Sequence, residues 1–129
     1  MRIRVYYEDT DAGGVVYHSN YLKFCERARS ELFFGKEPNI FDKDKGHFLL
    51  AKANCNFLKP AVLGDMLELR HELLEFKHAS LILRQEIYKE ETKIFSADFT
   101  LVYVQSLKPA VISDEIKELF LNAFKTPQS

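Results

Sequence analysis

Three long runs of alternating apolar and polar residues, with only a few residues between them, limit the folds open to this chain. They cover residues 66–77, 79–89 and 92–105, and each shows the two-residue period of a half-buried strand. A parallel connection needs a dozen or more residues, so gaps this short require antiparallel hairpins. Residues 48–58 predict another strand of the same kind, and residues 3–7 predict a short first strand.

Between residues 18 and 34 the apolar period becomes that of a helix. The apolar face of this helix is formed by Tyr21, Phe24, Cys25, Ala28 and Leu32. A second helix is expected after Ser113, whose side chain is a suitable N-cap. The 129 residues suit one domain, 1–129. The order of elements predicts an α+β fold, in which a five-stranded antiparallel sheet wraps one long helix and a C-terminal helix follows.

The phase of each run predicts which side chains share a face of the sheet. We expect Leu49 to lie on one face with Ala53 and Phe57. We expect Phe76 to lie with Met66 on the face away from the long helix. Apolar area left on that second face would be covered by a homo-oligomer.

Composition excludes several classes of function. The net charge is -1, from 18 basic and 19 acidic residues, whereas nucleic-acid binders usually carry a clustered basic excess. Cys25 and Cys55 lie far apart without a CxxC motif, so we expect neither a zinc site nor a disulfide, and expect both thiols to be buried and inert. No run approaches the roughly 20 apolar residues of a membrane span. We therefore expect a cytoplasmic protein with at most peripheral contact at the inner membrane.

The segment from Tyr7 to Tyr21 carries the clearest chemical signal. A strand runs into the acidic, glycine-rich turn Asp11-Ala-Gly-Gly14, and a helix begins at about His18. A helix N-terminus presents unpaired N–H groups and a partial positive charge, which polarise a carbonyl. A nearby Asp11 can attack that carbonyl or activate water, so the segment predicts an acyl-transfer site.

Each residue of this segment also has a purely structural interpretation. Asp11 also fits the role of a turn residue whose side-chain oxygen accepts hydrogen bonds from local backbone N–H groups. His18 fits a solvent-exposed first helical turn as well as a role in orienting substrate or moving protons. Tyr7 is in phase with Ile3 and Val5, which favours core packing.

Other motifs are incomplete. The Asp9-Thr-Asp11 opening of an EF-hand loop continues with Gly at the fifth position and Asn20 at the twelfth, so oxygen ligands are missing. Neither a GxxxxGK[ST] phosphate loop nor a GxSxG motif is present. We expect no metal and no cofactor. The basic residues near the later turns fit a solvated rim as well as a contact with phosphate groups.

The sequence YEDTDAGGVVYHSNYLKFCERAR, residues 7–29, resembles the opening signature of the 4-hydroxybenzoyl-CoA thioesterase family of hotdog-fold enzymes. Within that family it is most similar to YbgC-type acyl-CoA thioesterases linked to the Tol–Pal envelope system. Weaker similarity continues through FLKPAVLGD and the later strands to about residue 105. The resemblance implies a hotdog fold, hydrolysis of acyl-CoA without a cofactor, and homodimers or homotetramers with active sites at subunit interfaces.

The resemblance also implies roles for individual residues. Asp11 aligns with the family's catalytic carboxylate, and the N–H at His18 with the group that binds the thioester carbonyl. Tyr7 and His18 align with active-site side chains. The remaining positions expected at the substrate are Gly14, Val15, Tyr17 and Asn20.

Two other functions are compatible with the same fold. A hydroxyacyl thioester dehydratase would need an H-F-P-type loop, but Gly46-His47-Phe48 lacks the proline. A module that binds acyl groups or acyl-carrier protein without catalysis would not need Asp11. Hydrolysis of acyl-CoA therefore remains the leading hypothesis, with acyl-carrier protein as a second potential carrier.

Overall fold

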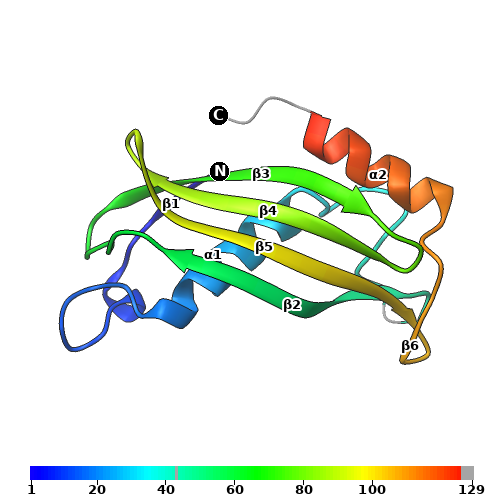
Figure 1. Ribbon diagram of the computed structural model, residues 1–129, viewed down its shortest axis with the longest axis horizontal. Coiled ribbons are helices and arrows are strands. Elements are labelled where there is room, and N and C mark those ends of the chain that lie inside the picture. The colour runs from blue at the N-terminus through cyan, green and yellow to red at the C-terminus, as the bar shows by residue number, and fades with distance from the viewer. Residues whose placement is uncertain (43, 126–129) are drawn as a thin grey trace.

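The computed structural model describes residues 1–42 and 44–125. Within them the chain forms six strands, two α-helices and one short 3-10 helix (Figure 1). In chain order these are β1 (Arg2–Arg4), the 3-10 helix η1 (Tyr7–Asp9), α1 (His18–Glu31), β2 (His47–Phe57), β3 (Met66–Phe76), β4 (Ser80–Lys89), β5 (Thr92–Gln105), β6 (Lys108–Pro109) and α2 (Asp114–Lys125).

The strands form one antiparallel sheet in the order β1-β3-β4-β5-β2. The predicted hairpins β3–β4 and β4–β5 are confirmed. The two-residue strand β6 pairs with the end of β5 and was not predicted, because its residues carry no strand pattern. Strand β2 follows α1 in the chain yet pairs with β5 at the far side, so its outer edge has no neighbouring strand in the described chain.

Helix α1 lies behind the curled sheet and packs its apolar stripe against it (Figure 1). Tyr21, Phe24, Cys25 and Ala28 are buried, as the helical period predicted. The Tyr21 ring stacks on Phe95 of β5 with centroids 5.1 Å apart. Burying each large apolar side chain contributes about 1.5–3 kcal/mol, so this layer is a main source of stability.

Helix α2 extends the apolar layer beyond the end of α1. Its residue Phe120 packs on Phe33, which follows α1, with ring centroids 4.5 Å apart. Leu81 and Leu83 of β4 belong to the same buried cluster. Ser113 caps the helix as predicted, since its Oγ accepts the Ile116 N–H at 3.2 Å.

Two β-bulges change the predicted faces of the sheet. Directly opposite residues of an antiparallel pair point to the same side. The register of β3 shifts after Leu73, so Phe76 pairs with the buried Leu81 and lies on the inner face, contrary to the prediction. The register of β2 shifts after Leu50, so Leu49 does not share a face with Ala53. An extra residue in one strand reverses every later side chain, and the sequence did not signal either insertion.

Candidate functional site

The loop that carries Asp11 is a small closed hairpin. The Asp11 N–H donates to the Val15 carbonyl at 2.9 Å, and the Gly14 N–H donates to the Asp11 carbonyl at 3.0 Å. Gly14 has φ +84, a left-handed conformation that favours glycine. An isolated bridge between Val15 and Val62 ties the hairpin to the loop after β2. The backbone therefore fixes where Asp11 lies.

The Asp11 side chain is exposed and is bonded on one oxygen. Its Oδ1 accepts the Gly13 N–H at 2.8 Å, which is the local turn contact that a purely structural role requires. Among the described residues, nothing donates to Oδ2. The turn contact orients the carboxylate and leaves its second oxygen open, so the structural and the chemical interpretations are compatible.

The first aspartate of the motif, Asp9, has a different role from Asp11. Asp9 is buried, and its Oδ2 accepts the Tyr6 N–H at 2.8 Å. Its carbonyl accepts the Tyr17 N–H at 3.0 Å and the Asn20 side-chain amide at 2.8 Å. Asp9 thus joins η1, the hairpin and the start of α1. Asn20 was expected at the substrate, but its side-chain amide nitrogen donates this hydrogen bond to the Asp9 carbonyl.

The N-terminus of α1 is left uncapped. Tyr17 occupies the N-cap position without a side-chain hydrogen bond, and the first turn contains no acidic residue. The Asn20 N–H donates to the Tyr17 carbonyl, whereas within the described chain the N–H groups of His18 and Ser19 meet no acceptor. Unsatisfied N–H groups at a helix start attract a carbonyl oxygen or an anion.

Two aromatic rings lie beside His18 at this helix start. The exposed His18 ring lies 4.3 Å from Tyr17 and 6.3 Å from Phe57 between centroids. Phe57 is the last residue of β2, so His18 lies beside the end of the edge strand. Tyr7 is 82% exposed on η1, and the prediction that it packs in the core is wrong because the chain leaves β1 after Arg4.

The remaining predictions on reactive groups concern cysteines, metals and membranes. Cys25 is buried, and burial raises the pKa of its thiol to about 12, which makes it inert as predicted. Cys55 is half-buried, so the prediction that it is buried is wrong, although partial burial still raises the pKa of its thiol. No cluster of three or more metal-ligating side chains occurs in the described ranges. No helix among the described residues is long and apolar enough to cross a membrane.

A buried polar cluster beneath α1 was missed from the sequence. Gln85 of β4 accepts a hydrogen bond from Arg29 at 3.1 Å and donates to the Cys25 carbonyl at 2.9 Å. Its amide nitrogen also lies 3.0 Å from His71 Nδ1. Burial lowers the pKa of His71 to about 4, so this ring is neutral at physiological pH. Arg29, His71 and Gln85 lie on α1, β3 and β4, so no local motif marks this cluster.

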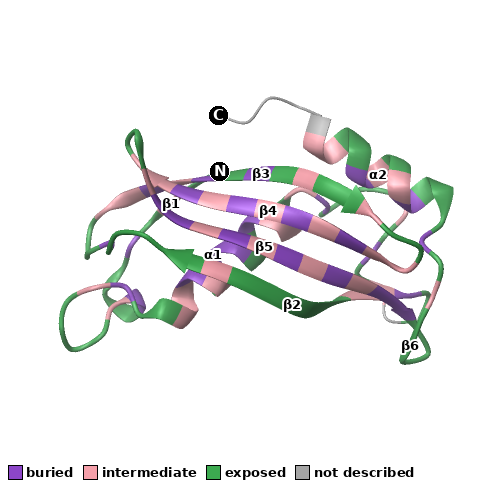
Figure 2. Ribbon diagram, in the orientation of Figure 1, coloured by how far each residue is buried: buried purple, intermediate pink, exposed green. Residues whose placement is uncertain are grey.

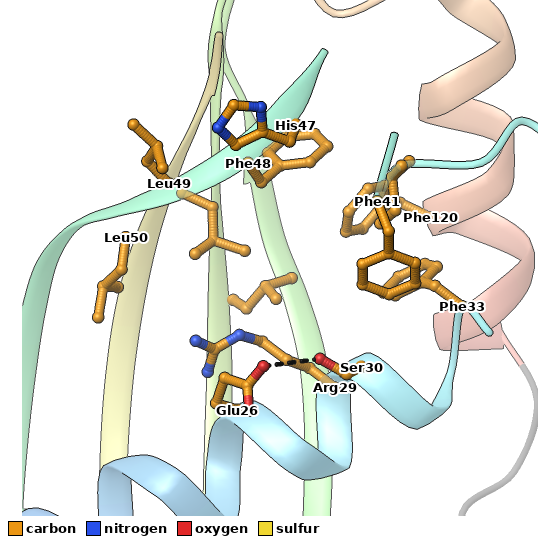
Figure 3. Close-up of a pocket in the computed structure, with 13 residues that line it drawn as sticks. Glu26, Arg29, Ser30, Phe33, Phe41, His47, Phe48, Leu49, Leu50 and Phe120 are labelled. Atoms are coloured by element: carbon orange, nitrogen blue, oxygen red, sulfur yellow. Dashed lines mark hydrogen bonds between the residues drawn. The ribbon is translucent and has the colours of Figure 1, made fainter. Parts of the chain in front are cut away.

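A cavity of about 400 Å³ was missed as well (Figure 3). It lies between the second half of α1, the start of β2 and α2. Its lining is Glu26, Arg29, Ser30, Phe33, Ile40, Phe41, His47, Phe48, Leu49, Leu50, Leu83, Leu101 and Phe120. None of the predicted site residues lines it. The lining is scattered along the chain, so no local motif marks it.

Comparison with known proteins places these features in a family. Residues 5–120 match the model of the Thioesterase-like superfamily. The chain is 42% identical over 134 residues to the acyl-CoA thioesterase YbgC of Helicobacter pylori strain 26695, covering 95% of this chain and 99% of that protein. It is 40% identical over 111 residues to the acyl-CoA thioester hydrolase YbgC of Escherichia coli O6:H1, covering 82% of this chain and 81% of that protein.

Solved structures agree on the fold. The chain superposes on the crystal structure of a hypothetical protein from Aquifex aeolicus with a TM-score of 0.85 at 29% identity, over 92% of this chain and 96% of that one. The curled antiparallel sheet around α1 is therefore the hotdog arrangement, as expected from the resemblance.

Proposed function

Because this chain belongs to the Thioesterase-like superfamily, we propose that Asp11 is the catalytic carboxylate of an acyl-CoA thioester hydrolase. The enzyme class itself follows from the YbgC relatives, which match most of the chain. One observation carries the assignment of the site. A single hydrogen-bonded loop presents an exposed carboxylate and leads directly into an uncapped helix N-terminus.

The carbonyl of the thioester docks against the first N–H groups of α1, near His18. Negative charge develops on this oxygen as the carbonyl carbon becomes tetrahedral, and the N–H groups and the helix dipole stabilise it. Loss of one such donor in other enzymes costs about 2.7–4 kcal/mol of barrier. The absence of an acidic residue from the first turn supports this role, since a carboxylate there would compete with the substrate oxygen.

Asp11 acts on the carbonyl carbon by one of two routes. In the first, a carboxylate oxygen attacks, the CoA thiolate leaves, and water hydrolyses the mixed anhydride. In the second, Asp11 takes a proton from water as the water attacks and the thiolate leaves. Both routes use an ionised carboxylate with an open oxygen. The free Oδ2 supports that requirement.

The other predicted site residues lie in the segment that contains Asp11 and the start of α1. His18 and Tyr7 lie exposed at the helix start and on η1, where we assign them contacts with the substrate. Gly14, Val15 and Tyr17 form the backbone between Asp11 and α1 and are proposed as substrate contacts on that ground. For Asn20 we propose that it positions the loop through the Asp9 carbonyl.

We propose a homodimer formed through β2. Strand β2 spans 11 residues at the edge of the sheet, and most of it is exposed (Figure 2). Strands β4 and β5 instead alternate buried and half-buried residues. A long exposed edge strand is a template for pairing with a second strand. Antiparallel pairing of β2 with its copy about a two-fold axis covers this edge.

Several finer expectations stay predictions: association of dimers into tetramers, acyl-carrier protein as a second carrier, a role in lipid metabolism, and a cytoplasmic setting. The mass of the assembly in solution tests the dimer. Release of free thiol from acyl-CoA by the wild type and by Asp11→Asn tests the chemistry. Binding of acyl-CoA without any hydrolysis would favour the alternative of a non-catalytic acyl-binding module.

A further inference from the structure

A second loop supports the hairpin that carries Asp11, which we call the Asp11 hairpin. This support loop, residues 61–65, lies between β2 and β3. The Val16 N–H of the hairpin donates to the Ala61 carbonyl at 2.9 Å, two residues before α1 begins. The position of the support loop therefore influences where the Asp11 carboxylate lies relative to the helix N-terminus.

The core holds the first residue of the support loop. Ala61 is fully buried, and its N–H donates to the Tyr21 hydroxyl at 3.2 Å. Tyr21 itself belongs to the buried stripe of α1. Packing and a buried hydrogen bond thus fix this end of the loop.

The next residue, Val62, lies outside the core. It is 41% exposed and forms the isolated bridge with Val15 of the Asp11 hairpin. The Val62 N–H donates to Asp65 Oδ2 at 2.9 Å, and the Asp65 N–H donates back to the Val62 carbonyl at 3.1 Å. Asp65 therefore closes the turn from which Val62 reaches the hairpin.

Lys89 binds the other oxygen of the Asp65 carboxylate. Lys89 is the last residue of β4, and the β4–β5 turn lies at the same end of the sheet as the link from β2 to β3 (Figure 1). The Lys89 Nζ lies 2.9 Å from Asp65 Oδ1. Partial burial alone would raise the pKa of Asp65, but the hydrogen bond from Val62 and the charge of Lys89 outweigh it and lower that pKa. Asp65 is therefore ionised at neutral pH.

The two carboxylates of Asp65 and Asp11 differ in what their oxygens contact. Asp65 has both oxygens bonded, whereas Asp11 has one oxygen open. The Asp65 carbonyl also accepts the Val5 N–H at 2.9 Å, which ties the support loop to the chain after β1. Asp65 is thus arranged to hold backbone in place.

Loss of these contacts should cost little stability. The hydrogen bond from Val62 to Asp65 is exposed, so water can replace it. The Lys89 side chain is 43% exposed, and ion pairs of this kind add little to the free energy of unfolding. Catalysis is far more sensitive, because a misplacement of about 1 Å can cost a hundredfold in rate.

We propose that Asp65 is a positioning residue for the hydrolysis performed by Asp11: paired with Lys89, it fixes Val62 and thereby the Asp11 hairpin. The proposal rests on the proposed thioesterase function. Asp65 acts through backbone contacts and touches neither the substrate nor the reacting atoms.

The first test measures kcat and KM for acetyl-CoA together with the free energy of unfolding. Asp65→Ala is expected to lower kcat by about tenfold, with KM within about threefold of wild type and stability nearly unchanged. Lys89→Met should lower kcat by less, because the hydrogen bond from Val62 remains. Lys89→Arg should keep the wild-type kcat, since a guanidinium also pairs with a carboxylate.

Two control variants come from a second ion pair of the same kind. Glu86 and Lys93 lie 2.6 Å apart, with side chains 22% and 39% exposed, and in the described chain neither bonds to the support loop. Glu86→Ala and Lys93→Met should therefore keep the wild-type kcat. A wild-type kcat in Asp65→Ala, or an equal loss in Glu86→Ala, would overturn the proposal.

The double variant tests whether Asp65 and Lys89 act as one unit. Asp65→Ala combined with Lys89→Met should have the same kcat as Asp65→Ala alone, because the second substitution removes a contact already lost. Losses of kcat that multiply would contradict the shared route. A rise in KM with kcat unchanged in Lys89→Met would assign Lys89 to the CoA moiety and overturn the proposal as well.

Amide hydrogen exchange gives a readout that does not need activity. The Val16 N–H should exchange about tenfold faster in Asp65→Ala than in wild type, whereas the Phe24 N–H in the middle of α1 should be unchanged. An enzyme that cleaves no acyl-CoA contradicts the proposed function, yet Val16 still reports on the support loop. An active enzyme with unchanged Val16 exchange in Asp65→Ala keeps the function and loses the positioning role.

Discussion

Asp11 and Gly13 are joined by a hydrogen bond of 2.8 Å from the Gly13 N–H to Asp11 Oδ1. This contact holds one oxygen of the carboxylate and leaves the other open on the surface of the loop. A Cβ at position 13 would lie 3.2 Å from the bonded oxygen, which is closer than an ordinary contact. The orientation of the Asp11 carboxylate therefore depends on glycine at position 13.

Gly13→Ala is expected to displace the Asp11 carboxylate by a few tenths of an ångström and to lower kcat by about tenfold, because catalysis is sensitive to small misplacement of the reacting group. Steady-state kinetics measure the loss. Gly35→Ala is the matched control: at φ +74 it should lower stability, with kcat unchanged, because residue 35 is far from the loop in the chain. Equal kcat in Gly13→Ala and wild type would contradict the aiming role.

Asp9→Ala is expected to act through stability. It leaves the partly buried Tyr6 N–H without its acceptor, and such an unsatisfied group costs about 1–3 kcal/mol. Denaturant unfolding measures the loss of free energy of unfolding. Glu91→Ala, in an exposed turn, should stay within error of wild type. An Asp9→Ala protein as stable as wild type would show that the hydrogen bond does not hold η1 in place.

The pH dependence of stability should reflect His71. Burial holds its folded-state pKa at about 4, below the ordinary value of 6.5 for a free histidine, so the unfolded chain binds a proton that the folded chain excludes. The contribution is complete above pH 6.5 and is lost as pH falls from 6.5 through 4. The full contribution of His71 to the free energy of unfolding is up to about 3 kcal/mol.

Unfolding free energies measured between pH 7 and 4 test this expectation. His71→Asn should flatten the slope, whereas His78→Gln, which replaces an exposed histidine, should keep it. A wild-type slope that survives in His71→Asn would assign the proton uptake to another group.

The edge strand gives a prediction on assembly. Ala53→Arg places a bulky charge on the exposed edge of β2 and is expected to shift the chain from dimer to monomer, since charges on edge strands block pairing. Light scattering of the wild type and the variant measures the change. Thr92→Arg, exposed at the start of β5, should remain dimeric. A wild-type monomer would remove the basis for the β2 interface.

The fold was largely predictable because its signals are local. Short gaps between long alternating runs require hairpins, and the apolar stripe of α1 includes Tyr21, Phe24 and Cys25 at helical spacing, all of which are buried. The faces of Leu49 and Phe76 were not predictable. Each depends on one extra residue in a strand, and an apolar residue at a bulge fits either phase.

The site was predictable only in part. The turn and helix start that carry Asp11 and His18 are contiguous in the chain, so the pattern predicted that they lie close together, and their catalytic role stays a prediction. The structure buries Asp9 and leaves Asp11 exposed. This difference depends on contacts of Asp9 with Tyr6 and Asn20 that no sequence spacing encodes. The cavity is assembled from α1, β2 and α2, and only the folded chain brings those elements together.

The central claim is that Asp11 performs the hydrolysis. Its most direct test is the release of free thiol from a panel of acetyl-, octanoyl- and benzoyl-CoA by the wild type and by Asp11→Asn. The asparagine keeps an oxygen that can accept the Gly13 N–H, so the fold and the assembly should be unchanged. We expect wild-type turnover and a loss of at least about a thousandfold in the variant. Turnover by Asp11→Asn within tenfold of wild type would contradict the account.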